Sequence, residues 1–219
     1  IWFSLILQII TGLIPLQGLF IKLDEKDTIL TDILALETTV QLIELLFYIW
    51  IAFSVMNIKK MAGRRYIDWV ITTPTMLLST IMFMKYQERN ERGELESNPI
   101  KTMDFIKENK YQILKLFGYN FLMLVFGYLG EVDIISKYIS IPIGFLFFYK
   151  AFELIYKNYA ITTTIGKQLF TFLVSIWSLY GVAAIMSPNV KNISYNILDI
   201  IAKNFYGLYI YYQITLLIK

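Results

Sequence analysis

The sequence predicts an all-α membrane protein, a seven-transmembrane helix bundle. Of the 219 residues, 57% are hydrophobic and only 17% are charged, and the mean hydropathy is +0.55. A soluble domain normally carries about 25% charged residues. The apolar residues gather in long runs, and about 20 such residues cross the hydrocarbon core of a bilayer. These observations predict an integral, multi-pass protein in contact with a lipid bilayer.

Polar separators divide the chain into seven apolar runs. The separators lie at 22–27, 59–64, 87–110, 130–133, 157–166 and 187–189, and the longest is interpreted as a solvated loop. None is long enough to separate domains, so residues 1–219 are predicted to form a single seven-helix domain. In chain order, the predicted spans are 1–22, 29–57, 65–86, 109–129, 132–157, 164–187 and 190–218.

Loop charges predict the orientation, because cytoplasmic loops of membrane proteins carry an excess of Lys and Arg. The first, third and fifth separators and the C-terminus hold more of these residues than the other separators do. The N-terminus is therefore expected to be extracellular and the C-terminus cytoplasmic. The net charge of +3 is too small to indicate nucleic acid as a partner, and association into a homo-oligomer is left open.

The residue types that are missing also restrict the chemistry. The chain contains no Cys and no His, so it has neither thiolate ligands nor the usual proton shuttle. Any proton relay must use carboxyl groups, a lysine and water. We expect no enzymatic activity.

Lys203 stands within the last apolar run, four residues after Asp199. This spacing places both side chains on one helix face. A charged side chain in the middle of a membrane costs roughly 2.5–3.5 kcal/mol or more, so such residues usually have a partner and a function. A lysine amine in an apolar pocket can form a Schiff base with an aldehyde, and a nearby carboxylate would balance the protonated imine. A purely structural ion pair is the alternative.

The third span carries a second set of polar residues. Asp68 and Thr72 are four residues apart and share a face, and Arg65 lies one turn outward and is expected to pair with Asp68. Together with Asp199 and Lys203, these residues would form a buried set of two positive and two negative groups.

These motifs resemble those of the microbial (type 1) rhodopsins. Arg65-Tyr-x-Asp-Trp-x-x-Thr-Thr-Pro74 is similar to the third helix of that family, and Asp199-x-x-x-Lys203 is similar to its retinal-binding signature. Trp177-Ser-Leu-Tyr180 resembles the pocket motif of the sixth helix. The resemblance covers essentially the whole chain in the right order.

The resemblance implies a cofactor and a role for each of these residues. Lys203 would carry all-trans retinal, bound covalently as a protonated Schiff base. Asp68 and Asp199 would be counterions, and Asp68 would accept the proton after isomerisation to the 13-cis form. The residues expected to wall the retinal are Trp69, Thr73, Met123, Trp177 and Tyr180.

The chain departs from the proton pumps of this family at one position of the third span. The pumps usually carry Asp or Glu seven residues after the position of Thr72, and this chain has Ser79 there. Return of a proton from the cytoplasm would then lack its usual donor, which argues against fast pumping.

The second span carries Glu37, Gln41 and Glu44 on one stripe, at spacings of four and three residues. A polar stripe in a span is what a water-filled pathway needs. This stripe resembles the glutamate ladder of the channelrhodopsins, whose central gate also uses an Asn after the retinal lysine and a Ser on the first helix. Asn204 and Ser4 are the matching candidates, and Asn192 and Asn196 extend the polar face of the last span. Hydrogen bonding between helices is the alternative for all of these residues.

We therefore expect a retinal photoreceptor, most like the viral rhodopsins, that acts as a light-gated channel for monovalent cations and protons. Its pore would lie between the first, second, third and seventh helices, and hydrogen bonds among Ser4, Glu44 and Asn204 would rearrange when it opens. The first alternative is a light-driven outward proton pump with Asp68 as acceptor. The second alternative is a photosensor that signals to a partner protein.

Overall fold

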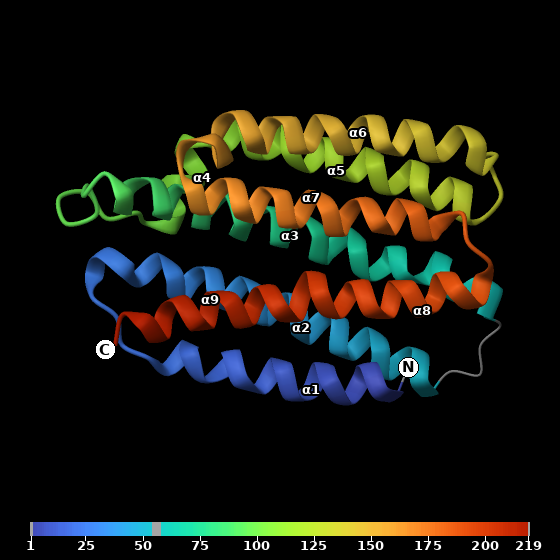
Figure 1. Ribbon diagram of the computed structural model, residues 1–219, viewed down its shortest axis with the longest axis horizontal. Coiled ribbons are helices and arrows are strands. Elements are labelled where there is room, and N and C mark those ends of the chain that lie inside the picture. The colour runs from blue at the N-terminus through green and yellow to red at the C-terminus, as the bar shows by residue number, and fades with distance from the viewer. Residues whose placement is uncertain (1, 54–57, 219) are drawn as a thin grey trace.

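The protein is an all-helical bundle, as the sequence predicts. The computed structural model describes residues 2–53 and 58–218, with the side chains of 2–53 and 61–218. Within these ranges all the regular elements are helices (Figure 1). They are α1 (Trp2–Leu16), η1 (Gln17–Phe20), η2 (Glu25–Asp27), α2 (Thr28–Phe53), α3 (Ile58–Glu91), α4 (Thr102–Glu108), α5 (Lys110–Glu131), α6 (Lys137–Asn158), η3 (Ala160–Thr162), α7 (Thr164–Ala184), α8 (Pro188–Asp199), η4 (Ile200–Asn204) and α9 (Phe205–Leu216).

The described helices form seven crossings of the bundle: α1, α2, α3, α5, α6, α7, and α8 with η4 and α9. The two ends of the chain lie at opposite ends of the bundle (Figure 1). We call the end where α1 begins the N end and the end where α9 finishes the C end. Six crossings are continuous helical segments that are long and apolar enough to span a membrane, among the residues that the structure describes. The seventh crossing is built from α8, η4 and α9, which follow one another along a common line (Figure 1).

The seventh crossing is divided because η4 is a π-helix, and it contains Lys203. A π segment interrupts the regular α-helical hydrogen bonding, and such segments are frequent at functional sites. Neither α8 nor α9, at 12 residues each, is long enough to span a bilayer alone. The crossing is therefore one span by position, although its periodicity changes at Lys203.

Several predicted helix ends differ from the structure. The end of the second predicted span, 54–57, lies outside the described residues. The predicted break at 59–64 is wrong, because α3 begins at Ile58 and includes all of these residues. The segment 87–110 is only partly a loop, since α3 continues to Glu91 and α4 follows at Thr102. The helices continue through charged residues beyond the apolar spans. Hydropathy therefore does not show where a helix ends.

The two halves of the bundle differ in what they bury. Toward the C end, the contacts between α2, α3 and α9 are mainly apolar, with Leu34, Ile81 and Ile210 at 0% exposure. Many large apolar side chains also point outward, including Phe3, Leu46 and Phe121. An apolar outer surface is expected for helices that face lipid, so the polar residues in the middle of the bundle must satisfy one another.

Candidate functional site

Lys203 lies in the middle of the bundle, and only 1% of its surface is exposed. Its Nζ donates a hydrogen bond to Asp68 Oδ2 of α3 at 2.6 Å. Asp199 Oδ1 lies 3.7 Å from the same nitrogen, and Glu44 Oε1 of α2 lies 3.8 Å from it. Three carboxyl groups from three crossings therefore surround one buried amine.

Arg65 forms the second charged centre, and it is fully buried. The sequence predicted a pair with Asp68, and this is wrong: Arg65 Nη1 binds Asp199 Oδ2 at 2.9 Å. Asp68 instead pairs with Lys203. Asp199 lies close to both cations, because one of its carboxylate oxygens binds Arg65 and the other lies 3.7 Å from Lys203 Nζ. Arg65 and Asp199 both also contact Tyr48 of α2, whose hydroxyl donates to Asp199 Oδ2 at 2.9 Å and accepts from Arg65 Nη1 at 3.0 Å.

Other polar groups complete this network on the side of the N end. Asn196 Oδ1 accepts a hydrogen bond from Arg65 and lies 3.1 Å from the Tyr48 hydroxyl oxygen. The Tyr180 hydroxyl of α7 donates to Asp199 Oδ1 at 2.9 Å. Asn192 is buried one turn further out, and its amide donates to the Pro188 carbonyl of its own helix at 2.8 Å. The structure therefore brings Asn196 into the charged network.

The hydroxyls of the two threonines of the third-span motif, Thr72 and Thr73, donate hydrogen bonds to backbone carbonyl oxygens of their own helix. Thr72 Oγ1 donates to the carbonyl oxygen of Asp68 at 3.0 Å, so its hydroxyl proton goes to the backbone and not to the carboxylate. Thr73 Oγ1 donates to the Trp69 carbonyl at 2.7 Å and accepts from the Asn120 amide of α5 at 2.8 Å. Asn120 thereby links α5 to α3 beside the site.

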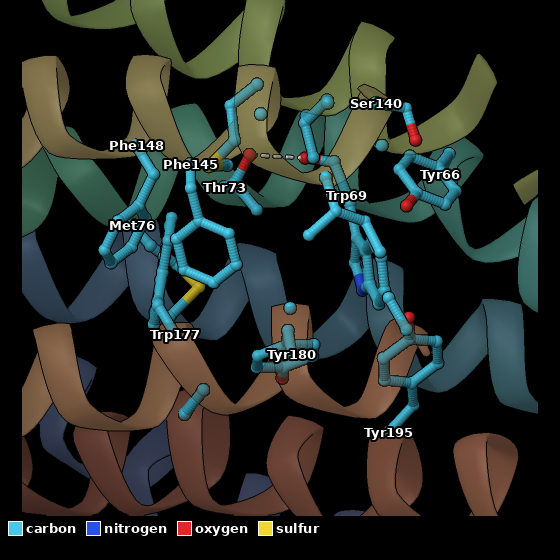
Figure 2. Close-up of a pocket in the computed structure, with 18 of the residues that line it drawn as sticks. Tyr66, Trp69, Thr73, Met76, Ser140, Phe145, Phe148, Trp177, Tyr180 and Tyr195 are labelled. Carbon is cyan, nitrogen blue, oxygen red and sulfur yellow. Dashed lines mark hydrogen bonds between the residues drawn. The ribbon is translucent and has the colours of Figure 1, made fainter. Parts of the chain in front are cut away.

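A cavity extends from Lys203 between α3, α5, α6 and α7. Its lining is mainly aromatic and apolar, and in Figure 2 Trp177, Tyr180 and Tyr195 lie along one side of it. All five residues predicted as walls line it, namely Trp69, Thr73, Met123, Trp177 and Tyr180. Gly181 also lines the cavity, and a Cβ there would lie 2.3 Å from the Phe145 ring, so the ring occupies the space that a side chain would need.

The first helix meets the site through Gln8. Gln8 Nε2 donates to Glu44 Oε1 at 3.3 Å, whereas Ser4, the predicted partner, lies four residues nearer the N end on α1. Asn204 is 1% exposed, and neither its amide nitrogen nor its oxygen has a hydrogen-bond partner among the described residues. The predicted hydrogen-bonded set of Ser4, Glu44 and Asn204 is therefore not the arrangement observed, because Gln8 occupies the position next to Glu44.

Gln41 connects α2 to the backbone of the π segment. Its Nε2 donates to the carbonyl oxygen of Lys203 at 3.4 Å. Gly207 makes this approach possible, because a Cβ at Gly207 would lie 2.0 Å from Gln41 Nε2. Gln41 therefore packs directly onto the crossing that carries Lys203.

We expect Gly207→Ala to destabilise the fold. The added methyl group would displace the Gln41 amide and break its bond to Lys203, and overpacking of this kind typically costs about 1–3 kcal/mol. Gly118→Ala is the matched control, because a Cβ at Gly118 meets no atom within 4 Å. Thermal unfolding in detergent should show a lower midpoint for the first variant and no loss for the second. Equal midpoints would show that the Gln41 contact contributes nothing to stability.

Glu37 lies two turns from Glu44 toward the C end and is 0% exposed. Its Oε1 contacts the hydroxyl of Ser79 on α3. The structure thus places Glu37 at the level of Ser79, apart from the carboxyl groups around Lys203. The three polar residues of the α2 stripe have three different partners, on α1, α3 and the π segment.

Three residues of this site, Tyr48, Gln8 and Asn120, were not predicted from the sequence. Tyr48 stands four residues after Glu44 and continues the stripe of α2, so the same helical spacing could have identified it. Gln8 stands four residues after Ser4 on the same face of α1. Asn120 is an isolated polar residue in an apolar helix, and only its contact with Thr73 reveals its position.

Comparison with known proteins supports one family. The family described as bacteriorhodopsin-like protein matches residues 1–217 of the chain. No curated protein sequence matches the chain. Among solved structures, the viral rhodopsin OLPVRII superposes with a TM-score of 0.82 at 26% sequence identity, over 96% of this chain and 93% of that chain.

Two further structures share the fold at lower identity. The blue light-absorbing proteorhodopsin from Med12 gives a TM-score of 0.71 at 16% identity, covering 98% of this chain and 93% of that chain. The light-driven proton pump Coccomyxa subellipsoidea rhodopsin CsR gives 0.68 at 18% identity, covering 96% and 93%. At these identities the similarity concerns the fold alone.

Proposed function

Because the chain belongs to the bacteriorhodopsin-like family, as a viral-like microbial rhodopsin, we propose that it is a light-gated cation channel with retinal bound to Lys203. The family makes it an integral multi-pass membrane protein and implies a retinal chromophore on a lysine. The role of each residue, the conducted ion and the orientation are part of our proposal. When bound, retinal supplies light absorption and a change of shape from all-trans to 13-cis.

The residues of this chain fit that group. The cavity is lined by aromatic rings (Figure 2), and Lys203 is one of its lining residues. Asp68 Oδ2, at 2.6 Å from the amine, would balance a positive charge on the nitrogen. Trp69, Met123 and Trp177 would hold the polyene by apolar contact and exclude water.

The charged residues hold the dark state closed on the N-end side. Arg65 is fixed by Asp199, Tyr48 and Asn196, and each of these side chains is at least 90% buried. The two cations, Arg65 and Lys203, and the two carboxylates, Asp68 and Asp199, together carry no net charge. Glu44 would add a third carboxyl group, so we propose that it carries a proton while the set is intact, because an unbalanced buried charge is costly.

One observation carries the proposal of a channel. Between α1, α2 and the π segment lie buried polar atoms without hydrogen-bond partners among the described residues: Gln8 Oε1, Gln41 Oε1, Glu44 Oε2 and both polar atoms of Asn204. Each unsatisfied buried group costs about 1–3 kcal/mol. Water and a cation would satisfy these oxygens, which are the ligand type that hard cations prefer. The polar stripe of α2 runs from Glu44 to Glu37 and extends this group of polar atoms toward the C end.

Beyond Glu37, toward the C end, apolar residues would block the proposed ion pathway. Ile33 and Leu34 of α2, Ile81 of α3, and Ile210 and Ile214 of α9 are all 0% exposed. A hydrophobic constriction blocks ions when it is dry. We propose that light-driven movement at Lys203 is transmitted through Gln41 to α2 and opens this constriction. The constriction and the Arg65 network would then be the two gates.

We also propose the orientation that the loop charges predict. The C end carries the larger number of Lys and Arg residues in its loops, and such an excess is typical of the cytoplasmic side. The N end would then be extracellular and the C end cytoplasmic. Monovalent cations and protons would pass between these two sides.

A light-driven outward proton pump is the second candidate, and a specific contact favours it. The 2.6 Å hydrogen bond from Lys203 to Asp68 places a proton acceptor directly beside the amine. A pump moves ions in one direction, whereas a channel follows the electrochemical gradient. Membrane current is therefore the measurement that separates the two functions.

Whole-cell current should be recorded under illumination at several holding potentials and with varied cation gradients. For a channel, the light-induced current changes sign at a potential that follows the gradients. A current of one sign at all potentials would support the pump and contradict the channel. Absence of any current from a coloured protein would favour a photosensor.

We expect Glu44→Gln to change the reversal potential or the size of the photocurrent while the protein stays coloured. The substitution keeps the contact with Gln8 but removes the group that can ionise 3.8 Å from Lys203 Nζ. The matched control is Glu153→Gln, at an α6 position paired with Lys157 at 2.8 Å on the surface. If Glu44→Gln and the control give the same currents, Glu44 does not line the ion pathway.

A further inference from the structure

The Ser140 hydroxyl of α6 is a buried polar group without a partner. Ser140 is 0% exposed and lines the cavity that extends from Lys203, and its Oγ has no hydrogen-bond partner within the part of the chain that the structure describes. A serine in a helix often donates to a carbonyl oxygen of its own helix, as Ser175 of α7 does to the Thr171 carbonyl at 2.8 Å. A buried hydroxyl that makes no such bond is costly, so it indicates that a further polar atom belongs at this place.

Two glycines of α5 leave room for this hydroxyl and for a second one. A Cβ at Gly130 would overlap Ser140 Oγ, and a Cβ at Gly127 would lie 2.7 Å from the hydroxyl oxygen of Tyr66. Gly127 and Gly130 are three residues apart and share a helix face within one turn. The hydroxyl groups of Ser140 and Tyr66 therefore lie along the same strip of α5.

Both hydroxyl groups belong to the part of the cavity toward the N end. In Figure 2, Ser140 and Tyr66 lie on one side of the lining, and Phe148 and Trp177 lie on the other. Lys203 enters the cavity from the seventh crossing, whereas Ser140 lines it from α6. A retinoid that is attached to Lys203 through its aldehyde carbon would therefore direct its ring toward α5 and α6.

The lining near Ser140 includes several small residues. Gly127 of α5, Gly144 of α6 and Ala184 of α7 all line the cavity. Ala184 is the last residue of α7, which runs toward the N end, so it lies in the same half of the bundle as Ser140 (Figure 1). Small side chains leave space for a substituent on the ring, and the Ser140 hydroxyl offers that substituent a hydrogen bond.

We propose that this part of the cavity recognises a retinoid whose ring carries an oxygen, as a hydroxyl or a keto group, and that Ser140 selects it. A serine hydroxyl donates one proton and accepts through two lone pairs, so it can bond to either group. A ring without oxygen leaves the Ser140 hydroxyl unsatisfied in an otherwise mainly apolar lining. This inference rests on the proposed retinal-binding function, which itself requires only that the aldehyde end reaches Lys203.

Competition between retinoids that share one polyene measures this selectivity. The protein is prepared without retinal and is offered equal amounts of all-trans retinal and all-trans 3-hydroxyretinal, and in a second experiment all-trans retinal and all-trans 4-hydroxyretinal. Bound retinoids are released with hydroxylamine and quantified by chromatography. We expect about fivefold to tenfold more of a hydroxylated retinoid than of retinal in at least one experiment, as for one additional neutral hydrogen bond. Equal binding in both experiments, or a preference for retinal, would overturn the proposal.

Two variants assign the preference to this part of the cavity. Ser140→Ala removes the hydroxyl and should bring the ratio of the two bound retinoids close to one, while all-trans retinal still binds. Ala184→Leu leaves the Ser140 hydroxyl in place but fills the space, and it should lower the share of the hydroxylated retinoid. Ser175→Ala is the matched control, because its hydroxyl is bonded within α7, and it should keep the full preference. A preference that Ser140→Ala leaves unchanged would overturn the role of Ser140.

Failure of this inference can be distinguished from failure of the proposed function. A protein that binds both retinoids in equal amounts and becomes coloured retains the retinal-binding function, and only the selection by Ser140 is refuted. A protein that binds neither retinoid and stays colourless contradicts the retinal-binding function itself.

Discussion

Lys203→Ala is expected to abolish visible absorbance after reconstitution with all-trans retinal. The amine of Lys203 is the group that lies at the cavity, and three carboxyl groups within 3.8 Å of it would stabilise a positive nitrogen. Alanine offers no nitrogen for a covalent bond. The absorbance spectrum of the purified, reconstituted variant measures this directly.

Lys191→Ala is the matched control for that experiment. Lys191 is the other buried lysine among the described side chains, but both Glu131 carboxylate oxygens bind it at 2.8 Å near the N end. The control variant should therefore remain coloured. A coloured, hydroxylamine-sensitive Lys203→Ala protein would show that another lysine carries the cofactor and would refute the assignment of this site.

Asp68→Asn is expected to shift the absorption band to the red. Asp68 supplies the nearest oxygen to Lys203 Nζ, at 2.6 Å, while Asp199 and Glu44 lie at 3.7 and 3.8 Å. Removing the nearest negative charge destabilises a positive charge on the nitrogen in the ground state, so the excitation energy decreases. The position of the absorption maximum in the dark is the measurement.

Asp199→Asn separates this spectral effect from a structural one. It also removes the partner of the fully buried Arg65, and breaking a buried ion pair typically costs about 3–5 kcal/mol. We therefore expect a larger loss of thermal stability from Asp199→Asn than from Asp68→Asn. An Asp68→Asn protein with an unchanged spectrum would show that Asp199 is the main counterion.

The number and order of the membrane crossings could be predicted from the sequence, because a span requires a long apolar run whatever its neighbours are. The ends of the helices could not. The start of α3 at Ile58 and the helix α4 lie in charged segments, where hydropathy does not distinguish helix from loop. The π segment at Lys203 was also not predicted, because it keeps the apolar character of its span.

Within the site, the sequence by itself determined which residues share a helix face. Spacings of three and four placed Glu37, Gln41 and Glu44 on one stripe of α2, and Asp199 one turn from Lys203. This follows from the geometry of a single helix, and the structure keeps all of these residues buried.

Only the tertiary structure decided which groups meet across helices. Arg65 binds Asp199 and not Asp68, Gln8 occupies the expected place of Ser4 beside Glu44, and Glu37 meets Ser79. Helical periodicity gives the direction of a side chain but not the rotation, height or identity of the neighbouring helix. In an apolar bundle each buried charge takes the partner that this packing brings within reach, because no water is available to replace it.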